Sequence, residues 1–151
     1  MFHRINLEGE TSFVRIAFVF SKKNQGFMSL TRQVMGQFEK SGHTVKEVIV
    51  EDLNAPISFR PFDLVFVGST VESFFGGRIS REIGNFLTGS TGLEGKKTVA
   101  YIKPNLFGTD KAMRRLMAQM EARGAFVVDF DSIKSLHEAK PLIERHINKR
   151  G

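Results

Sequence analysis

The stretch from Asp63 to Leu87 constrains the fold more than any other part of the chain. It opens with an unbroken apolar run at positions 64–67, which is typical of a strand buried on both faces of a parallel sheet. A polar, glycine-containing loop is predicted over residues 69–77. Four apolar residues then recur at the spacing of one helical face: Ile79, Ile83, Phe86 and Leu87. Strand, loop and helix form half of a βαβ unit, and open α/β sheets bind ligands where such a loop leaves a central strand.

The rest of the chain repeats this alternation. Further strands are predicted over residues 13–20, 43–50, 98–102 and 125–130, the second of them at an edge of the sheet. The clearest helical stripes are Phe27, Leu30, Val34 and Phe38, ended by Gly42, and Met113, Leu116, Met117 and Met120, capped by Thr109 or Asp110 and ended by Gly124. Five strands that alternate with helices predict an α/β fold with a mostly parallel sheet.

Two segments are less regular. Residues 51–62 carry two prolines and no helical stripe, so we expect an irregular connection there. In the last segment, Ser135 and Glu138 have the spacing of a capping box, but Pro141 is expected to break a helix that begins at Ser135. A helix that begins near Lys140, with Pro141 in its first turn, is the alternative.

Length, charge and cysteine content narrow the class of protein. A chain of 151 residues suggests one domain, which we place at 13–150 after an N-terminal extension, 1–12. The absence of cysteine excludes disulfides and thiolate chemistry, and no apolar stretch is long enough for a membrane span. We therefore expect a cytoplasmic protein. The net charge of +6 favours acidic partners, although the scattered lysines and arginines argue against a nucleic-acid surface.

Two doubly wound folds have this number of elements. A response-regulator receiver needs clustered carboxylates after its first strand, but here the loop reads Ser21-Lys22-Lys23-Asn24. Residues 63–87, with Gly68-Ser69, Phe74-Phe75 and Gly76-Gly77, together with residues 96–128, resemble the flavodoxin-like family. The resemblance implies a three-layer α/β/α sandwich with a five-stranded parallel sheet in the order 2-1-3-4-5, and it implies FMN as cofactor.

The resemblance also assigns the cofactor-binding loops. The first loop corresponds to the family's phosphate-binding loop, Ser/Thr-x-Thr-Gly-Asn-Thr, and consists of Ser21, Lys22, Lys23, Asn24, Gln25 and Gly26. Only Ser21 matches that pattern; the lysines supply charge in place of hydroxyl groups, and Asn24 tolerates the left-handed conformation of the replaced glycine. The flavin ring is expected between two later loops, represented by Ser69, Thr70, Phe74, Phe75 and Gly76 and by Asn105, Leu106, Phe107 and Gly108.

The implied function is electron transfer, or reduction of a small acceptor such as a quinone, by bound FMN. Whether the protein is an enzyme stays open. Because the first loop departs from the family pattern, a second hypothesis is a binding module that kept the fold and lost FMN. The basic net charge supports a third hypothesis, an interaction protein. If flavin binds, the charge favours an acidic redox protein or a small-molecule electron acceptor as the partner. No histidine spacing suggests a metal site, and no catalytic residue is assigned.

Overall fold

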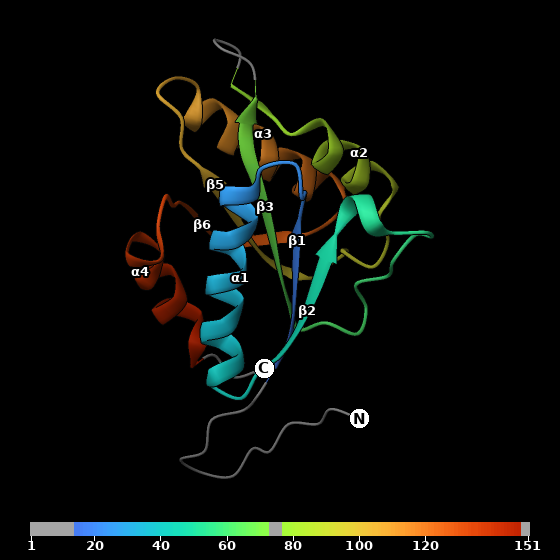
Figure 1. Cartoon of the computed structure of the whole chain (residues 1–151). Coiled ribbons are helices and arrows are strands. Elements are labelled where there is room, and N and C mark those ends of the chain that lie inside the picture. Colours follow the sequence, from blue (N-terminus) through green and yellow to red (C-terminus); the bar gives the residue numbers. More distant parts are fainter. Residues whose placement is uncertain (1–13, 73–76, 149–151) are drawn as a thin grey trace.

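A computed structural model describes residues 14–72 and 77–148. Its parallel strands run side by side in the order β2-β1-β3-β5-β6 (Figure 1). Their bounds are β1 Arg15–Phe20, β2 Thr44–Ile49, β3 Leu64–Glu72, β5 Lys97–Lys103 and β6 Phe126–Ser132. A short strand, β4 (Arg78–Ile79), pairs antiparallel with the end of β3. The predicted order of the five parallel strands is confirmed, and β4 is an addition to it.

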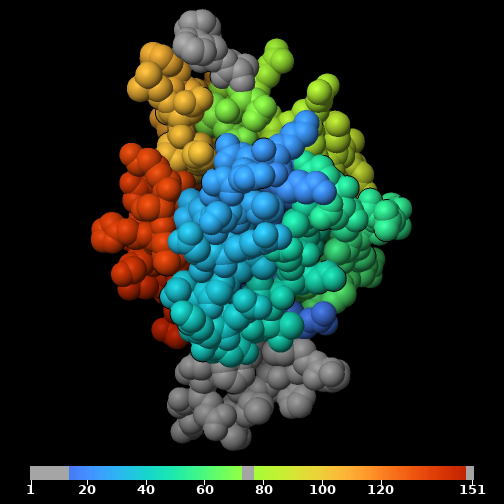
Figure 2. Space-filling view, in the orientation of Figure 1, coloured from blue at the N-terminus to red at the C-terminus, as the bar shows by residue number. Residues whose placement is uncertain are grey.

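Helices cover both faces of the sheet. Their bounds are α1 Gln25–Lys40, α2 Arg81–Gly89, α3 Thr109–Ala122 and α4 Leu136–Ile147. α1 and α4 pack together on one face, and α2 and α3 pack on the other (Figure 1). Figure 2 views the face that α1 and α4 form. The connection after β2 holds only a single 3-10 turn, Val50–Asp52, and no α-helix, as its prolines predicted.

Alternation along β1 builds the two halves of the core. Ile16, Phe18 and Phe20 face α1 and α4, whereas Ala17 and Val19 face α2 and α3. The ring of Phe18 stacks on that of Phe66 from β3 at a centroid distance of 4.5 Å. Because β1 and β3 are central and covered on both sides, residues 16–20 and 64–67 are apolar without interruption, which is the pattern that identified the two strands.

The predicted boundary between β3 and its loop is wrong. β3 continues to Glu72, since Ser69 and Thr70 lie opposite Ile102 and Lys103 of β5 in the parallel ladder. Val71 and Glu72 then pair with β4. The polar sequence concealed this extension because the ladder bonds are made by backbone groups, which every residue supplies.

The predicted start of the helix α2 is also wrong. Ile79 belongs to β4, and Ser80 caps the helix by accepting a hydrogen bond from the amide of Ile83. Ile79 packs into the same core as Ile83 and Leu87, so its spacing matched a helical face although its backbone is extended.

Two further caps differ from the expectation. α3 is capped by the backbone of Gly108, at φ +83°, rather than by Thr109 or Asp110. α4 begins after Ser135 and continues through Pro141, which was expected to break it. The Ser135 cap and the burial of Leu142 and Ile143 offset the hydrogen bond that a proline nitrogen lacks.

The predicted extension at residues 1–12 lies outside the described residues, so the domain limits stay a prediction. Within the described ranges, no helix combines the length and apolarity needed to cross a membrane.

Candidate functional site

A small cavity lies at the carboxyl ends of β1 and β3, beside the first turns of α1 and α2. Its volume is about 230 Å³. Five of the predicted site residues line it: Ser21, Lys23, Asn24, Ser69 and Thr70. This is the point where the strand order reverses between β1 and β3, as expected for ligand sites of doubly wound sheets.

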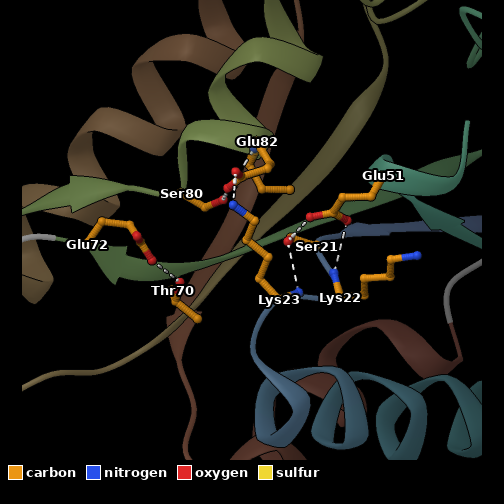
Figure 3. A network of polar contacts seen from close by, with 9 residues as sticks. Ser21, Lys22, Lys23, Glu51, Thr70, Glu72, Ser80 and Glu82 are labelled. Carbon is orange, nitrogen blue, oxygen red and sulfur yellow. Dashed lines mark hydrogen bonds and ion pairs between the residues drawn. The ribbon is translucent and has the colours of Figure 1, made fainter.

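Glu51, in the 3-10 turn after β2, forms hydrogen bonds with the first loop. The hydroxyl of Ser21 and the backbone amide of Lys22 both donate to the Glu51 carboxylate, the second at 3.0 Å (Figure 3). Ser21 Oγ in turn accepts from the amide of Lys23 at 3.2 Å. A carboxylate of the protein thus takes two hydrogen bonds in the region where the resemblance placed a phosphate.

The two lysines of the loop are directed to acidic side chains. Lys22 Nζ lies 2.5 Å from Asp52, and Lys23 Nζ lies 2.5 Å from Glu82 at the start of α2. Figure 3 shows Lys23 reaching across the cavity toward Glu82 and Ser80. The hydrogen bond from Lys23 holds the pKa of the Glu82 carboxyl below its usual value. Both ammonium charges are therefore balanced by neighbouring carboxylates.

Asn24 has a different role from the expected one. Its backbone is extended, at φ −104°, and its side chain caps α1 by accepting from the amide of Phe27 at 2.9 Å. The loop consequently ends at Asn24, and Gln25 and Gly26 form the first turn of the helix. The amides of these two residues have no partner within the helix, as is usual for a helix N-terminus.

Lys103, at the carboxyl end of β5, adds a cation to this helix start. Its Nζ lies 3.9 Å from the position that a Cβ on Gly26 would take. Lys103 forms no ion pair with the residues that the structure describes. The amides of Gln25 and Gly26 and the Lys103 ammonium are therefore the groups open to an anion here.

The end of β3 is held by side-chain hydrogen bonds and carries an acidic residue. Buried Ser69 accepts from the amide of Ser80 at 2.9 Å, which fixes the residue that caps α2. Thr70 donates to the Glu72 carboxylate at 2.8 Å (Figure 3). Glu72 and Glu82 both line the cavity, so Ser69 and Thr70 position an acidic wall rather than present free hydroxyls.

The loop after β5 is largely exposed and stands at the upper edge of the molecule, where its orange atoms project in Figure 2. Asn105 closes this loop by accepting from Thr109, and its own amide donates back to Thr109 at 2.9 Å. Leu106 is 84% exposed and Phe107 is 53% exposed. These apolar side chains fit the edge of a planar ring, but neither Leu106 nor Phe107 lines the 230 Å³ cavity.

Gly108 joins this loop to the segment that follows β3. A Cβ on Gly108 would lie 2.7 Å from the Cα of Gly77, and both residues have positive φ angles. Two glycines are therefore needed for the two backbones to meet. The other predicted ring contacts, Phe74, Phe75 and Gly76, lie outside the described residues.

The fit to a flavin differs between the two parts of the site. Ligand pockets of drug-sized molecules typically measure about 300–1,000 Å³, so the described cavity does not enclose a flavin by itself. The phosphate cradle fits poorly, because Glu51 already accepts from the Ser21 hydroxyl and the Lys22 amide. The start of α1 with Lys103 fits an anion better.

Sequence reasoning missed Glu51, Glu82 and Lys103. The position of each of these residues in the sequence could have indicated it. Glu51 and Lys103 stand at the carboxyl ends of the strands that flank β1 and β3, and Glu82 stands in the first turn of the following helix. Parallel neighbours bring such positions to one edge of the sheet. Which cation pairs with which carboxylate depends on three-dimensional contacts that spacing does not encode.

The similarity to known proteins lies in the fold. No family model matches the sequence, and no curated protein matches it. The structure is similar to oxidised flavodoxin 1 from Bacillus cereus, with a TM-score of 0.69, 14% identity, and coverage of 87% of this chain and 93% of that one. Two-electron reduced Megasphaera elsdenii flavodoxin gives a TM-score of 0.67 at 15% identity, covering 89% and 99%. A Pseudomonas aeruginosa flavodoxin mutant gives 0.61 at 9%, covering 88% and 96%. The protein has the flavodoxin-like α/β fold.

Proposed function

We propose that this protein binds a flavin, FMN, at the carboxyl ends of β1, β3 and β5, and that it serves in electron transfer or in the reduction of a small acceptor. The observation that carries the proposal is the convergence of the first loop, the β3 end and the β5 loop at the reversal point of a flavodoxin-like sheet. The flavodoxins that it resembles in fold are the reason to choose a flavin. A cytoplasmic location belongs to the same proposal.

Residues of this chain have separate parts in that function. The amides of Gln25 and Gly26 and the Lys103 ammonium hold the phosphate end. Leu106 and Phe107, exposed beside the site, cover one edge of the ring. The bound flavin supplies the redox chemistry, and the carboxylate of Glu72 disfavours a build-up of negative charge near it.

Lys103→Gln tests the phosphate assignment. Because riboflavin lacks the phosphate, we expect this change to weaken FMN binding by about tenfold and to leave riboflavin binding unchanged, as measured by quenching of flavin fluorescence. Lys97→Gln is the matched control, since Lys97 lies at the opposite end of β5. Equal losses of FMN and riboflavin affinity in the Lys103 variant would place the phosphate elsewhere.

One observation favours a second function, a binding module that kept the fold without the cofactor. The Glu51 carboxylate, which accepts from Ser21 and Lys22, completes the first loop without any ligand. Under this alternative neither FMN nor riboflavin binds to the wild-type protein, and Lys103→Gln changes neither the FMN titration nor the riboflavin titration.

A further inference from the structure

A groove between α2 and α3, with a volume of about 580 Å³, adjoins the described site. Four arginines line it: Arg78, Arg81, Arg115 and Arg123. The twelve residues along the groove include no aspartate and no glutamate. Four positive charges in a concave surface without an acid raise the local potential well above that of a mixed surface.

Two of these arginines contact backbone carbonyls. Arg123 donates to the backbone carbonyl of Ser90 at 3.1 Å, and Arg115 donates to that of Gly77 at 3.4 Å. The carbonyl of Ser90 orients the Arg123 guanidinium without neutralising its charge. Arg78 and Arg81 are exposed and make no ion pair with any residue that the structure describes.

Below the arginines, the groove is apolar and kept open by small residues. Ile79 and Leu87 form part of its floor, and both side chains are buried. Gly84 of α2 and Ala122 of α3 line the space between the helices. A glycine inside a helix costs about 1 kcal/mol relative to alanine. A Cβ on Gly84 would lie 3.4 Å from the Gln119 side chain, an ordinary van der Waals contact, so alanine would fit there but would fill part of the groove.

This combination selects for one class of ligand. Guanidinium groups bind carboxylates in a two-bond geometry, and an apolar floor accepts aliphatic side chains. Asn85 and Gln119 supply amide groups that pair with a peptide backbone. Among the described residues that line the groove, none is an aromatic residue on which a nucleic-acid base would stack. An acidic protein segment with apolar residues therefore fits better than a nucleic acid.

We propose that the α2–α3 groove is the docking site for an acidic segment of a partner protein. Ser80 lines both this groove and the candidate cofactor cavity, so a docked partner lies next to that cavity. The docking site stands on its own charges and shape, and its test needs no flavin.

The test uses a fluorescein-labelled synthetic peptide of alternating glutamates and leucines, with a glutamine-for-glutamate peptide as control. We expect saturable binding of the acidic peptide that weakens as salt is raised. Arg81→Gln combined with Arg123→Gln should lower its affinity at least tenfold. Arg114→Gln combined with Lys111→Gln removes the same charge from exposed positions of α3 outside the groove and should change the affinity less than twofold.

Three outcomes would overturn the proposal. Equal losses in both double variants would show that net charge alone attracts the peptide. If the glutamine peptide binds as tightly as the glutamate peptide, the groove does not recognise carboxylates. A single-stranded oligonucleotide of equal charge that binds more tightly, with the same dependence on Arg81 and Arg123, would assign the groove to nucleic acid. Circular dichroism of each variant checks that the fold is intact.

Discussion

Glu51 occupies two hydrogen-bond donors of the first loop that a bound phosphate would otherwise meet. It accepts from Ser21 and from the amide of Lys22, and it sits on the turn after β2 where it contributes nothing to the core. A phosphate that approached the same donors would meet a carboxylate of the same sign. We therefore expect Glu51 to disfavour an anion at these two donors.

Removing this carboxylate should strengthen binding of the phosphorylated ligand. Glu51→Ala frees the Ser21 hydroxyl and the Lys22 amide, so we expect FMN affinity to rise about tenfold relative to riboflavin. Glu47→Ala changes the net charge equally but removes only an exposed pair with Arg32. An unchanged ratio of the two affinities in Glu51→Ala would mean that Glu51 does not compete with phosphate.

Gly68 offers a test of packing at the same scale. A Cβ at this position in β3 would lie 2.2 Å from the ring of Tyr101, which is buried and bonded to Thr31 at 2.9 Å. Gly68→Ala should therefore lower the free energy of unfolding in urea by about 1–3 kcal/mol. Gly36→Ala, in α1 with nothing within 4 Å, should raise it by about 0.5–1 kcal/mol. Equal stability of the Gly68 variant and the wild type would show that Tyr101 moves aside at no cost.

At the scale of elements, the loops were harder to predict than the strands and helices they join. The buried runs of β1, β3 and β5 and the stripe of α1 follow from the sequence, because burial on both faces or on one face leaves a periodic apolar pattern. The extension of β3 and the short β4 leave no such pattern, since backbone pairing alone defines them. The meeting of Gly77 and Gly108 depends on two segments far apart in sequence.

That glycine contact should be measurable. Gly108→Ala places a Cβ 2.7 Å from the Cα of Gly77 and also forces alanine to φ +83°. Gly95→Ala also forces alanine to a positive φ, +71°, but its Cβ would meet no atom within 4 Å. We expect the Gly95 change to cost about 1–2 kcal/mol of unfolding free energy and the Gly108 change to cost more. Equal losses of unfolding free energy in the two variants would mean that the contact between Gly77 and Gly108 does not contribute to stability.

A second element contact joins β6 to α4 and depends on pH. Asp129 lies 2.7 Å from both Arg145 and His146. Burial by itself raises the pKa of this carboxyl, but hydrogen bonds from Arg145 and His146 outweigh burial, so the pKa lies below its ordinary value of 3.8. The ionised carboxylate thus stabilises the fold above that value, and this stabilisation is lost as the pH falls through the lowered pKa.

Asp129→Asn should therefore destabilise the protein at neutral pH, and the difference from the wild type should shrink below about pH 4. Urea unfolding at several pH values measures this difference. Asp131→Asn is the control, because Asp131 lies farther from Arg145, at 3.5 Å, and is more exposed. A difference for Asp129→Asn that grows on acidification would contradict the assignment.

For the whole molecule, the order of elements predicted an α/β fold with a mostly parallel sheet. The resemblance of two stretches to the flavodoxin-like family then supplied the order of the five parallel strands that the structure has. The same information located the site at one edge of the sheet, yet it did not reveal that Lys22 and Lys23 are balanced by Asp52 and Glu82. The lysines of the first loop therefore add little net charge there, whereas four arginines line the α2–α3 groove.

The most direct measurement is the visible absorption spectrum of the purified protein, recorded before and after incubation with FMN and removal of free ligand. The proposed function predicts the spectrum of a bound flavin in at least the second sample, shifted from that of free FMN by the apolar and acidic surroundings of the site. A colourless protein in both samples would contradict flavin binding and would leave a flavodoxin-like fold that serves another ligand.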